Sequence, residues 1–237
     1  MQPSAAFAAA TIGGMMGFGD LSYDVAHVLG GVMLLVSFVL LYQRRIVALV
    51  NALAVQGVLL ALAALWQGYV QGAPQLYVTA AIALLAKGVL IPIYLRRLVM
   101  RLAPAQRAEA ASGIGASMLA GFLLVSLSIM VVLPATTGAR ALAREDLAIA
   151  LSIILLGMLM MVTRRTALAQ IAGLMTLENG IVLAAVGVAG MPLVIELSTA
   201  GLVLVIALIA GVFSRVMQER FDSTDTSLLD PHRGEGR

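Results

Sequence analysis

Most of this chain consists of apolar stretches about twenty residues long, separated by short polar connections. A helix needs ~20 apolar residues to cross the ~30 Å hydrocarbon core of a bilayer, so each stretch is long enough to span a membrane. Hydrophobic residues make up 61% of the sequence and charged residues 11%. Soluble domains are about half apolar and about a quarter charged. The sequence therefore predicts an all-α, polytopic membrane protein with about seven transmembrane helices.

The expected organisation follows from hydropathy and turn signals. Residues 1–22, rich in Ala, Gly and Met, form an N-terminal extension, and a polar connector at 135–146 separates two membrane halves. The four-helix N-terminal half covers residues 23–134, the three-helix half covers 147–215, and a polar tail follows at 216–237. The seven spans are expected at about 24–42, 46–68, 75–95, 112–133, 147–162, 166–188 and 191–213.

Arginines between the spans predict the orientation. In a seven-span arrangement only Arg140 and Arg144 lie on one side, beside Glu145 and Asp146. Because basic loops stay in the cytoplasm, the N-terminus is expected outside and the C-terminus in the cytoplasm. Ten arginines lie on the cytoplasmic side: Arg44, Arg45, Arg96, Arg97, Arg101, Arg107, Arg164, Arg165, Arg215 and Arg220. The basic pI near 9.7 reflects this topology, so no nucleic-acid partner is expected.

Residue types exclude several kinds of cofactor site. The chain has no cysteine, which removes disulfides, thiolate zinc sites and iron–sulfur ligation. Its two histidines are His27 and His232, and the second lies in the polar tail, so they are not matched for a membrane haem. We expect no catalytic residue, metal or cofactor in this chain.

Three ionisable residues remain inside the predicted spans: Lys87, Glu178 and Glu196. A charge at the bilayer centre costs roughly 2.5–3.5 kcal/mol on insertion scales, so such residues are usually functional. We interpret the three as members of a proton pathway, with Glu178 central. The alternatives are that Lys87 snorkels to an interface, that Glu178 makes a structural hydrogen bond, and that interfacial water reaches Glu196.

The surroundings of Glu178 favour an internal helix. At ~100° per residue, Gly173, Gly180 and Gly187 form a stripe roughly opposite Glu178. Small residues let helix backbones approach closely, so the stripe should pack against one neighbour while Glu178 faces another. Polar contacts between helices are also expected from Gln56, Asn51 and Asn179.

Five motifs in order resemble the hydrogenase-4 component E proteins. They are Val55-Gln56-Gly57, Leu85-Ala86-Lys87-Gly88-Val89-Leu90-Ile91-Pro92, Thr163-Arg164-Arg165, Gly173-Leu174-Met175-Thr176-Leu177-Glu178-Asn179-Gly180-Ile181 and Gly190-Met191-Pro192-Leu193-Val194-Ile195-Glu196. The last three spans are also similar to the K-type subunit of respiratory complex I and the C-type subunit of multisubunit sodium/proton antiporters. In the K-type pattern an acid follows the Gly-Leu pair, where this chain has Met175. Glu178 lies one turn later, a shift of ~4.5 Å along the helix.

The resemblance implies a non-catalytic membrane subunit of a complex I-like oxidoreductase of the hydrogenase-4 or formate hydrogenlyase type. Such a subunit would lie in a bacterial cytoplasmic (inner) membrane, with antiporter-like membrane subunits and peripheral hydrogenase or oxidoreductase subunits as partners. Two alternatives stay open. One is a subunit of a multisubunit cation/proton antiporter without redox chemistry, and the other is a scaffold whose acids only join helices.

Overall fold

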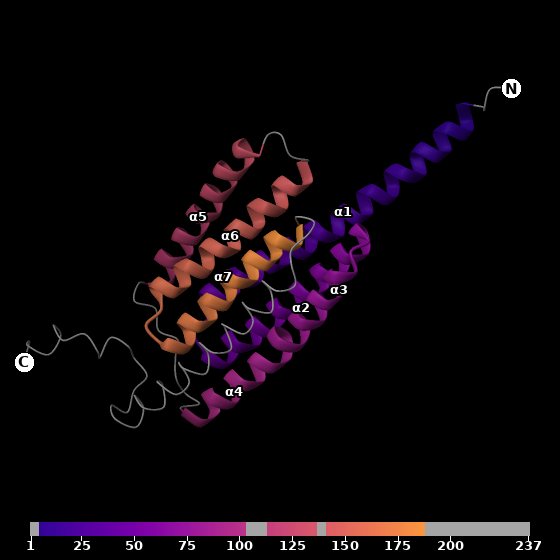
Figure 1. Ribbon diagram of the computed structural model, residues 1–237. Helices are drawn as coiled ribbons and strands as arrows, with labels where there is room; N and C mark the ends of the chain where they lie inside the picture. The colour runs from indigo at the N-terminus through magenta and orange to yellow at the C-terminus, as the bar shows by residue number, and fades with distance from the viewer. Residues whose placement is uncertain (1–4, 103–112, 137–140, 188–237) are drawn as a thin grey trace, which may run out of the picture.

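The computed structural model describes residues 5–102, 113–136 and 141–187, and these are almost entirely helical (Figure 1). The elements are α1 (Ala5–Tyr42), α2 (Ile46–Gln71), α3 (Pro74–Ile82), the π-helix η1 (Ala83–Leu90), α4 (Ile91–Leu102), α5 (Ile114–Ala135), α6 (Ala141–Thr163) and α7 (Ala167–Gly187). Within the described residues, six helices are long and apolar enough to cross a membrane. The expected seventh span at 191–213, Glu196 and the tail lie outside the described residues.

Helix ends differ from the expected boundaries in two places. Helix α1 runs without a break from Ala5 through the first span, so no break separates residues 1–22 from that span within the described residues. The expected connector at 135–146 is shorter, because α5 continues to Ala135 and α6 already begins at Ala141. The segment that opens α6 is rich in Ala, Leu, Arg and Glu, all strong helix formers. Hydropathy marks the membrane-spanning part of a helix, and the helix itself extends beyond it.

The turn between α2 and α3 is the one expected from the Gln71-Gly72-Ala73-Pro74 sequence. Gly72 adopts a left-handed conformation with φ of 61°, and Ala73 N–H bonds to the carbonyl of Gly68 at 3.1 Å. Only glycine takes this conformation without steric cost. Pro74 then opens α3, where its fixed φ suits the first helical turn. This pair makes α2 and α3 antiparallel neighbours.

The third span is not a uniform α-helix. Its middle, η1, is π-helical, and Lys87 lies within it. Pro92 is the second residue after this widened segment. A proline inside a regular α-helix lacks a hydrogen-bond donor and clashes with the carbonyl four residues earlier, so the wider turns accommodate it. The sequence motif around Lys87 therefore produces a local change in helix type.

Helix α7 lies between α6 and α2 in the bundle (Figure 1). Its contact with α6 is the most extensive helix pairing in the described residues, while α2 touches α1, α3, η1 and α4 as well. Helix α5 packs mainly on α6 and is the least buried span. The third and sixth spans thus meet around α2, near the centre of the bundle.

Two apolar cores fill the bundle, one towards each end. The first includes Leu41, Leu53 and Met175, and the second includes Met33, Leu60 and Val182. Between these cores lie five buried polar residues from four helical elements. They are Ser37 in α1, Gln56 in α2, Lys87 in η1, and Glu178 with Asn179 in α7. We call these five residues the central polar layer.

Candidate functional site

An ion pair joins η1 to α7 in the central polar layer. Lys87 Nζ lies 3.0 Å from Glu178 Oε1, and the two side chains are 2% and 7% exposed. The distance is that of an ion pair, but the contact lacks hydrogen-bond geometry. Within the described part of the chain, neither Lys87 Nζ nor either Glu178 oxygen has a hydrogen-bond partner. The pair therefore keeps free capacity to donate and accept hydrogen bonds.

Such a pair is expensive to bury. Removing each charge from water costs several kcal/mol, and mutual attraction offsets this only when other hydrogen bonds complete the arrangement. Proton transfer from Lys87 to Glu178 would replace two charges with two neutral groups, at the same position and without moving either helix. A paired amine and carboxylate of this kind can therefore hold or pass a proton as its surroundings change.

Beside this pair runs a chain of hydrogen bonds across three helices. Asn179 Nδ2 donates to Gln56 Oε1 at 3.2 Å, and Gln56 Nε2 donates to Ser37 Oγ at 2.9 Å. Ser37 Oγ in turn donates to the carbonyl of Met33 at 2.9 Å. All three polar side chains are almost completely buried. Because Asn179 follows Glu178 directly, this chain fixes the turn of α7 that carries the glutamate.

Close backbone packing holds Lys87 from the other side. A Cβ added to Gly57 would lie 2.6 Å from the carbonyl carbon of Lys87 and 2.7 Å from its oxygen. Atoms at such distances overlap, so α2 can approach η1 this closely only with glycine at position 57. The motif around Gln56 thus supplies both a hydrogen-bonding side chain and the space that seats Lys87.

The glycine stripe of α7 was expected to pack closely against a neighbouring helix, and two of its three members pack against α6. A Cβ at Gly173 would lie 2.9 Å from the carbonyl oxygen of Gly157, and one at Gly180 would lie 2.9 Å from the Ile154 nitrogen. Among the described residues, a Cβ at Gly187 would meet only the Asp146 side chain, at 4.0 Å, so no close backbone contact forms there. Glu178 faces a different neighbour from the stripe, because its partner Lys87 comes from η1.

The other predicted residues have mixed outcomes. Lys87 does not snorkel to an interface, since its amine is buried against Glu178. Gln56 and Asn179 make the expected contacts between helices. Asn51 does not join them, because its side chain is exposed on the surface of α2. Glu196 lies outside the described residues, so its place in a pathway stays a prediction.

Arg164 has a structural role that its position between spans did not reveal. Its guanidinium is buried and donates to the carbonyls of Leu40 and Leu41 at the end of α1. Gln170 donates to the Arg164 carbonyl at 3.0 Å. Burial, and to a smaller extent the neighbouring Arg44, lower the pKa of Arg164 from its usual value. A cation at a helix C-terminus complements the helix dipole, so Arg164 ties the α6–α7 turn to α1.

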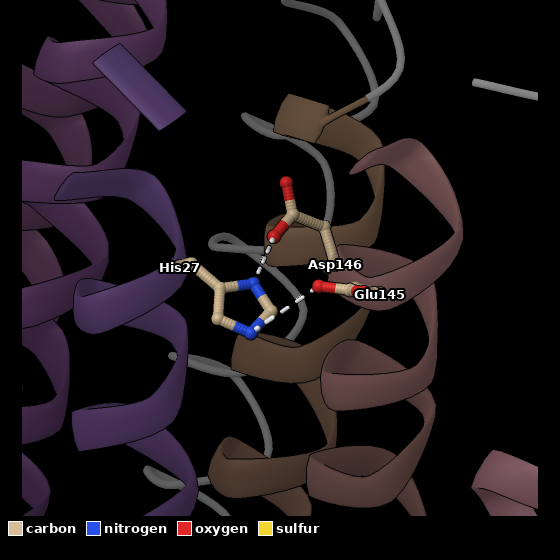
Figure 2. A network of polar contacts seen from close by, with 3 residues as sticks. All are labelled: His27, Glu145 and Asp146. Atoms are coloured by element: carbon tan, nitrogen blue, oxygen red, sulfur yellow. Dashed lines mark ion pairs between the residues drawn. The ribbon is translucent and has the colours of Figure 1, made fainter. Parts of the chain in front are cut away.

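A second polar cluster lies at the opposite end of the bundle and was missed from the sequence. His27 of α1 lies between two acids of α6, with Nε2 3.6 Å from Glu145 Oε2 and Nδ1 3.7 Å from Asp146 Oδ1 (Figure 2). We call these three residues the rim cluster. The sequence did contain a clue to this cluster. His27 and the Glu145-Asp146 pair each lie near the start of an expected span, on the same side of the membrane. In the described residues, no group of three or more His, Cys, Asp or Glu side chains is arranged to hold a metal ion.

Comparison with known proteins identifies a distant relative. The chain is 29% identical over 202 residues to Uncharacterized protein Rv0085 of Mycobacterium tuberculosis, covering 84% of this chain and 91% of that protein. No family model matches the chain, and no solved structure matches it. The similarity spans nearly the full length of the relative.

Proposed function

We propose that this chain is an integral membrane subunit of a complex I-like oxidoreductase of the hydrogenase-4 or formate hydrogenlyase type, in which Lys87 and Glu178 are part of a proton-translocation pathway. The observation that carries the proposal is the ion pair of these two residues, 3.0 Å apart and almost fully buried between apolar cores. Charges at this depth are costly, and proton relays are a common reason for them.

The hydrogen-bond partners of the buried polar groups support a role beyond joining helices. A scaffold needs each buried polar group to have a partner, as Asn179, Gln56 and Ser37 largely do. Lys87 and Glu178 instead have atoms without hydrogen-bond partners in the part of the chain that the structure describes. These atoms keep unused hydrogen-bonding capacity, which a proton relay requires.

The resemblance of the five motifs supports the type of complex. In this proposal the chain has seven spans, an external N-terminus and a cytoplasmic C-terminus, and lies in a bacterial cytoplasmic membrane beside antiporter-like subunits. Affinity purification of the tagged chain in mild detergent tests this part. Recovery of hydrogenase or other oxidoreductase subunits with antiporter-like subunits is expected. Recovery of antiporter subunits alone would instead assign the chain to a cation/proton antiporter.

The proton role is tested with variants of Glu178 in membrane vesicles that contain the assembled complex. Glutamine keeps the shape of the side chain but cannot exchange a proton, so Glu178→Gln should abolish proton translocation while subunit composition is unchanged. Glu178→Asp should retain part of it. Asp24→Asn, which removes an exposed carboxylate at the start of the first span, is the matched control and should behave like the wild type. Normal translocation by Glu178→Gln would reject the proton role.

A further inference from the structure

A small cavity lies next to the rim cluster, where α1, α2, α6 and α7 converge. Its volume is about 20 Å³, and its lining includes Gln67, Asp146, Leu183 and Val186. One water molecule needs roughly 10–15 Å³ and two or more polar partners. The Asp146 carboxylate and the Gln67 amide supply such partners, so the cavity can hold a single water molecule.

Two hydrogen bonds made by Gln71 lie beside the cavity, one within α2 and one between α2 and α7. Gln71 Nε2 donates to Gln67 Oε1 at 3.0 Å and to the Val186 carbonyl at 3.1 Å. Gln67 accepts one of these bonds through its amide oxygen, and its amide nitrogen carries separate N–H donors. The end of α7 is thereby fixed to α2 beside the cavity.

The rim cluster leads from the surface towards this cavity. Side-chain exposure falls from 52% at Glu145 to 42% at His27 and 28% at Asp146, which lines the cavity. Each imidazole nitrogen of His27 faces one of the two acids, as Figure 2 shows. An imidazole can accept a proton on one nitrogen and release one from the other. The three side chains are therefore ordered for stepwise proton transfer.

An apolar layer separates the cavity from Glu178. Leu183 lies five residues beyond Glu178 on α7, or ~7.5 Å along the helix. Between these levels pack Met33, Leu60 and Val182 of the second apolar core. A proton that passes between the cavity and Glu178 must therefore cross this thin apolar layer.

From this arrangement we infer that His27, Asp146 and the adjoining cavity form a proton-exchange vestibule between the membrane surface at this end of the bundle and Glu178. The inference rests on the proposed function, since it gives that pathway its opening at the rim. Glu145 and Asp146 of α6 are the ionisable groups within ion-pair distance of His27 among the described residues, and α2 and α7 contribute amide and apolar groups there. Asp24 lies one turn away on α1.

The same contacts would also suit a simple latch between α1 and α6, and substitutions at His27 separate the two roles. Lysine keeps a positive charge beside the acids but cannot relay a proton through two nitrogens. In vesicles containing the assembled complex, His27→Gln should slow proton translocation by up to about 10²-fold, the lower range for a positioned proton-transfer group. His27→Lys should be equally slow. Millimolar imidazole, added only to the compartment facing the rim cluster, should accelerate His27→Gln and leave the wild type unchanged.

Wild-type translocation by His27→Gln would overturn the vestibule, and so would recovery in His27→Lys without imidazole, which would identify a latch. Asp146→Asn gives a second test, because it removes the proton acceptor next to the cavity and should slow translocation without rescue by imidazole. Measuring Glu178→Gln in parallel distinguishes failure of the vestibule inference from failure of the proposed function. If translocation is slow in Glu178→Gln but normal in His27→Gln, only the vestibule is rejected. If translocation is normal in Glu178→Gln, both the vestibule and the proposed function are rejected.

Discussion

The central polar layer and the rim cluster each place a basic side chain against an acid, yet their surroundings differ. In the layer, Lys87 and Glu178 are 2% and 7% exposed and lie 3.0 Å apart between two apolar cores. In the rim cluster, His27 and its acids are at least a quarter exposed and 3.6–3.7 Å apart. The first pair is close and dry, and the second is looser and open to solvent.

The two sites differ in how much burial of the pair costs and in how easily solvent reaches it. A buried pair is expensive to form and costly to break, because the remaining charge has no water to solvate it. An exposed pair contributes ~0–1 kcal/mol, since solvent screens it and can replace either partner. The central layer can therefore hold a proton away from bulk water, and the rim cluster can exchange one with it. A pathway needs both properties at different depths.

Breaking the central pair from one side should give the largest change in stability. Lys87→Met leaves Glu178 buried without a counter-charge, which should lower the free energy of unfolding by up to about 3–5 kcal/mol. Adding Glu178→Gln removes the unpaired charge, so the double variant should recover most of that loss. Thermal unfolding of the purified chain in detergent measures both. Equal losses in the single and double variants would show that the two residues are not coupled.

The close approach of α2 and η1 should give the next largest effect. Gly57→Ala places a Cβ 2.6 Å from the Lys87 backbone, where no flexible side chain can yield, and should cost about 1–3 kcal/mol or more. Gly31→Ala is the matched control, because nothing lies within 4 Å of its added Cβ. Both gain the ~1 kcal/mol helix propensity of alanine, so Gly31→Ala should be neutral or stabilising in the same unfolding assay. Similar behaviour of the two variants would contradict this packing.

The rim cluster should show the smallest effect. His27→Gln should lower stability by no more than about 1 kcal/mol, and the loss should shrink as salt rises. The Lys87→Met loss should be nearly independent of salt, because that pair is shielded from ions. Unfolding at low and high ionic strength compares the two directly. A large, salt-insensitive loss from His27→Gln would place the rim cluster in the same class as the central pair.

Much of the fold was predictable because long apolar stretches identify candidate membrane-spanning helices. Six of the expected spans match apolar helices in the described residues, and the Gly72-Pro74 turn lies where its sequence indicated. Helix ends were less predictable, since residues near Ala141 are good helix formers but not apolar. The π-helix around Lys87 was not foreseen, because it depends on both Pro92 and the close packing of Gly57.

The sequence predicted which residues belong to the candidate site better than it predicted which of them contact each other. Depth along the sequence singled out Lys87 and Glu178, but their contact depends on how α7 and η1 face each other across α2. Ser37 was missed because serine is common in membrane helices and its value lies in bonding to Gln56. Asn51 was wrongly grouped with Gln56. The two residues are five positions apart on α2, and Asn51 lies on the exposed surface of that helix.

The central claim is that Glu178 exchanges a proton during turnover, and infrared difference spectroscopy of the assembled complex tests it most directly. With isotope-labelled glutamate, the spectrum of the working complex minus the resting complex reports protonation of individual carboxyl groups. The account predicts a glutamate carboxyl signal that appears with turnover and disappears in Glu178→Gln with the complex still assembled. A spectrum with no glutamate signal, or one that persists unchanged in Glu178→Gln, would contradict it.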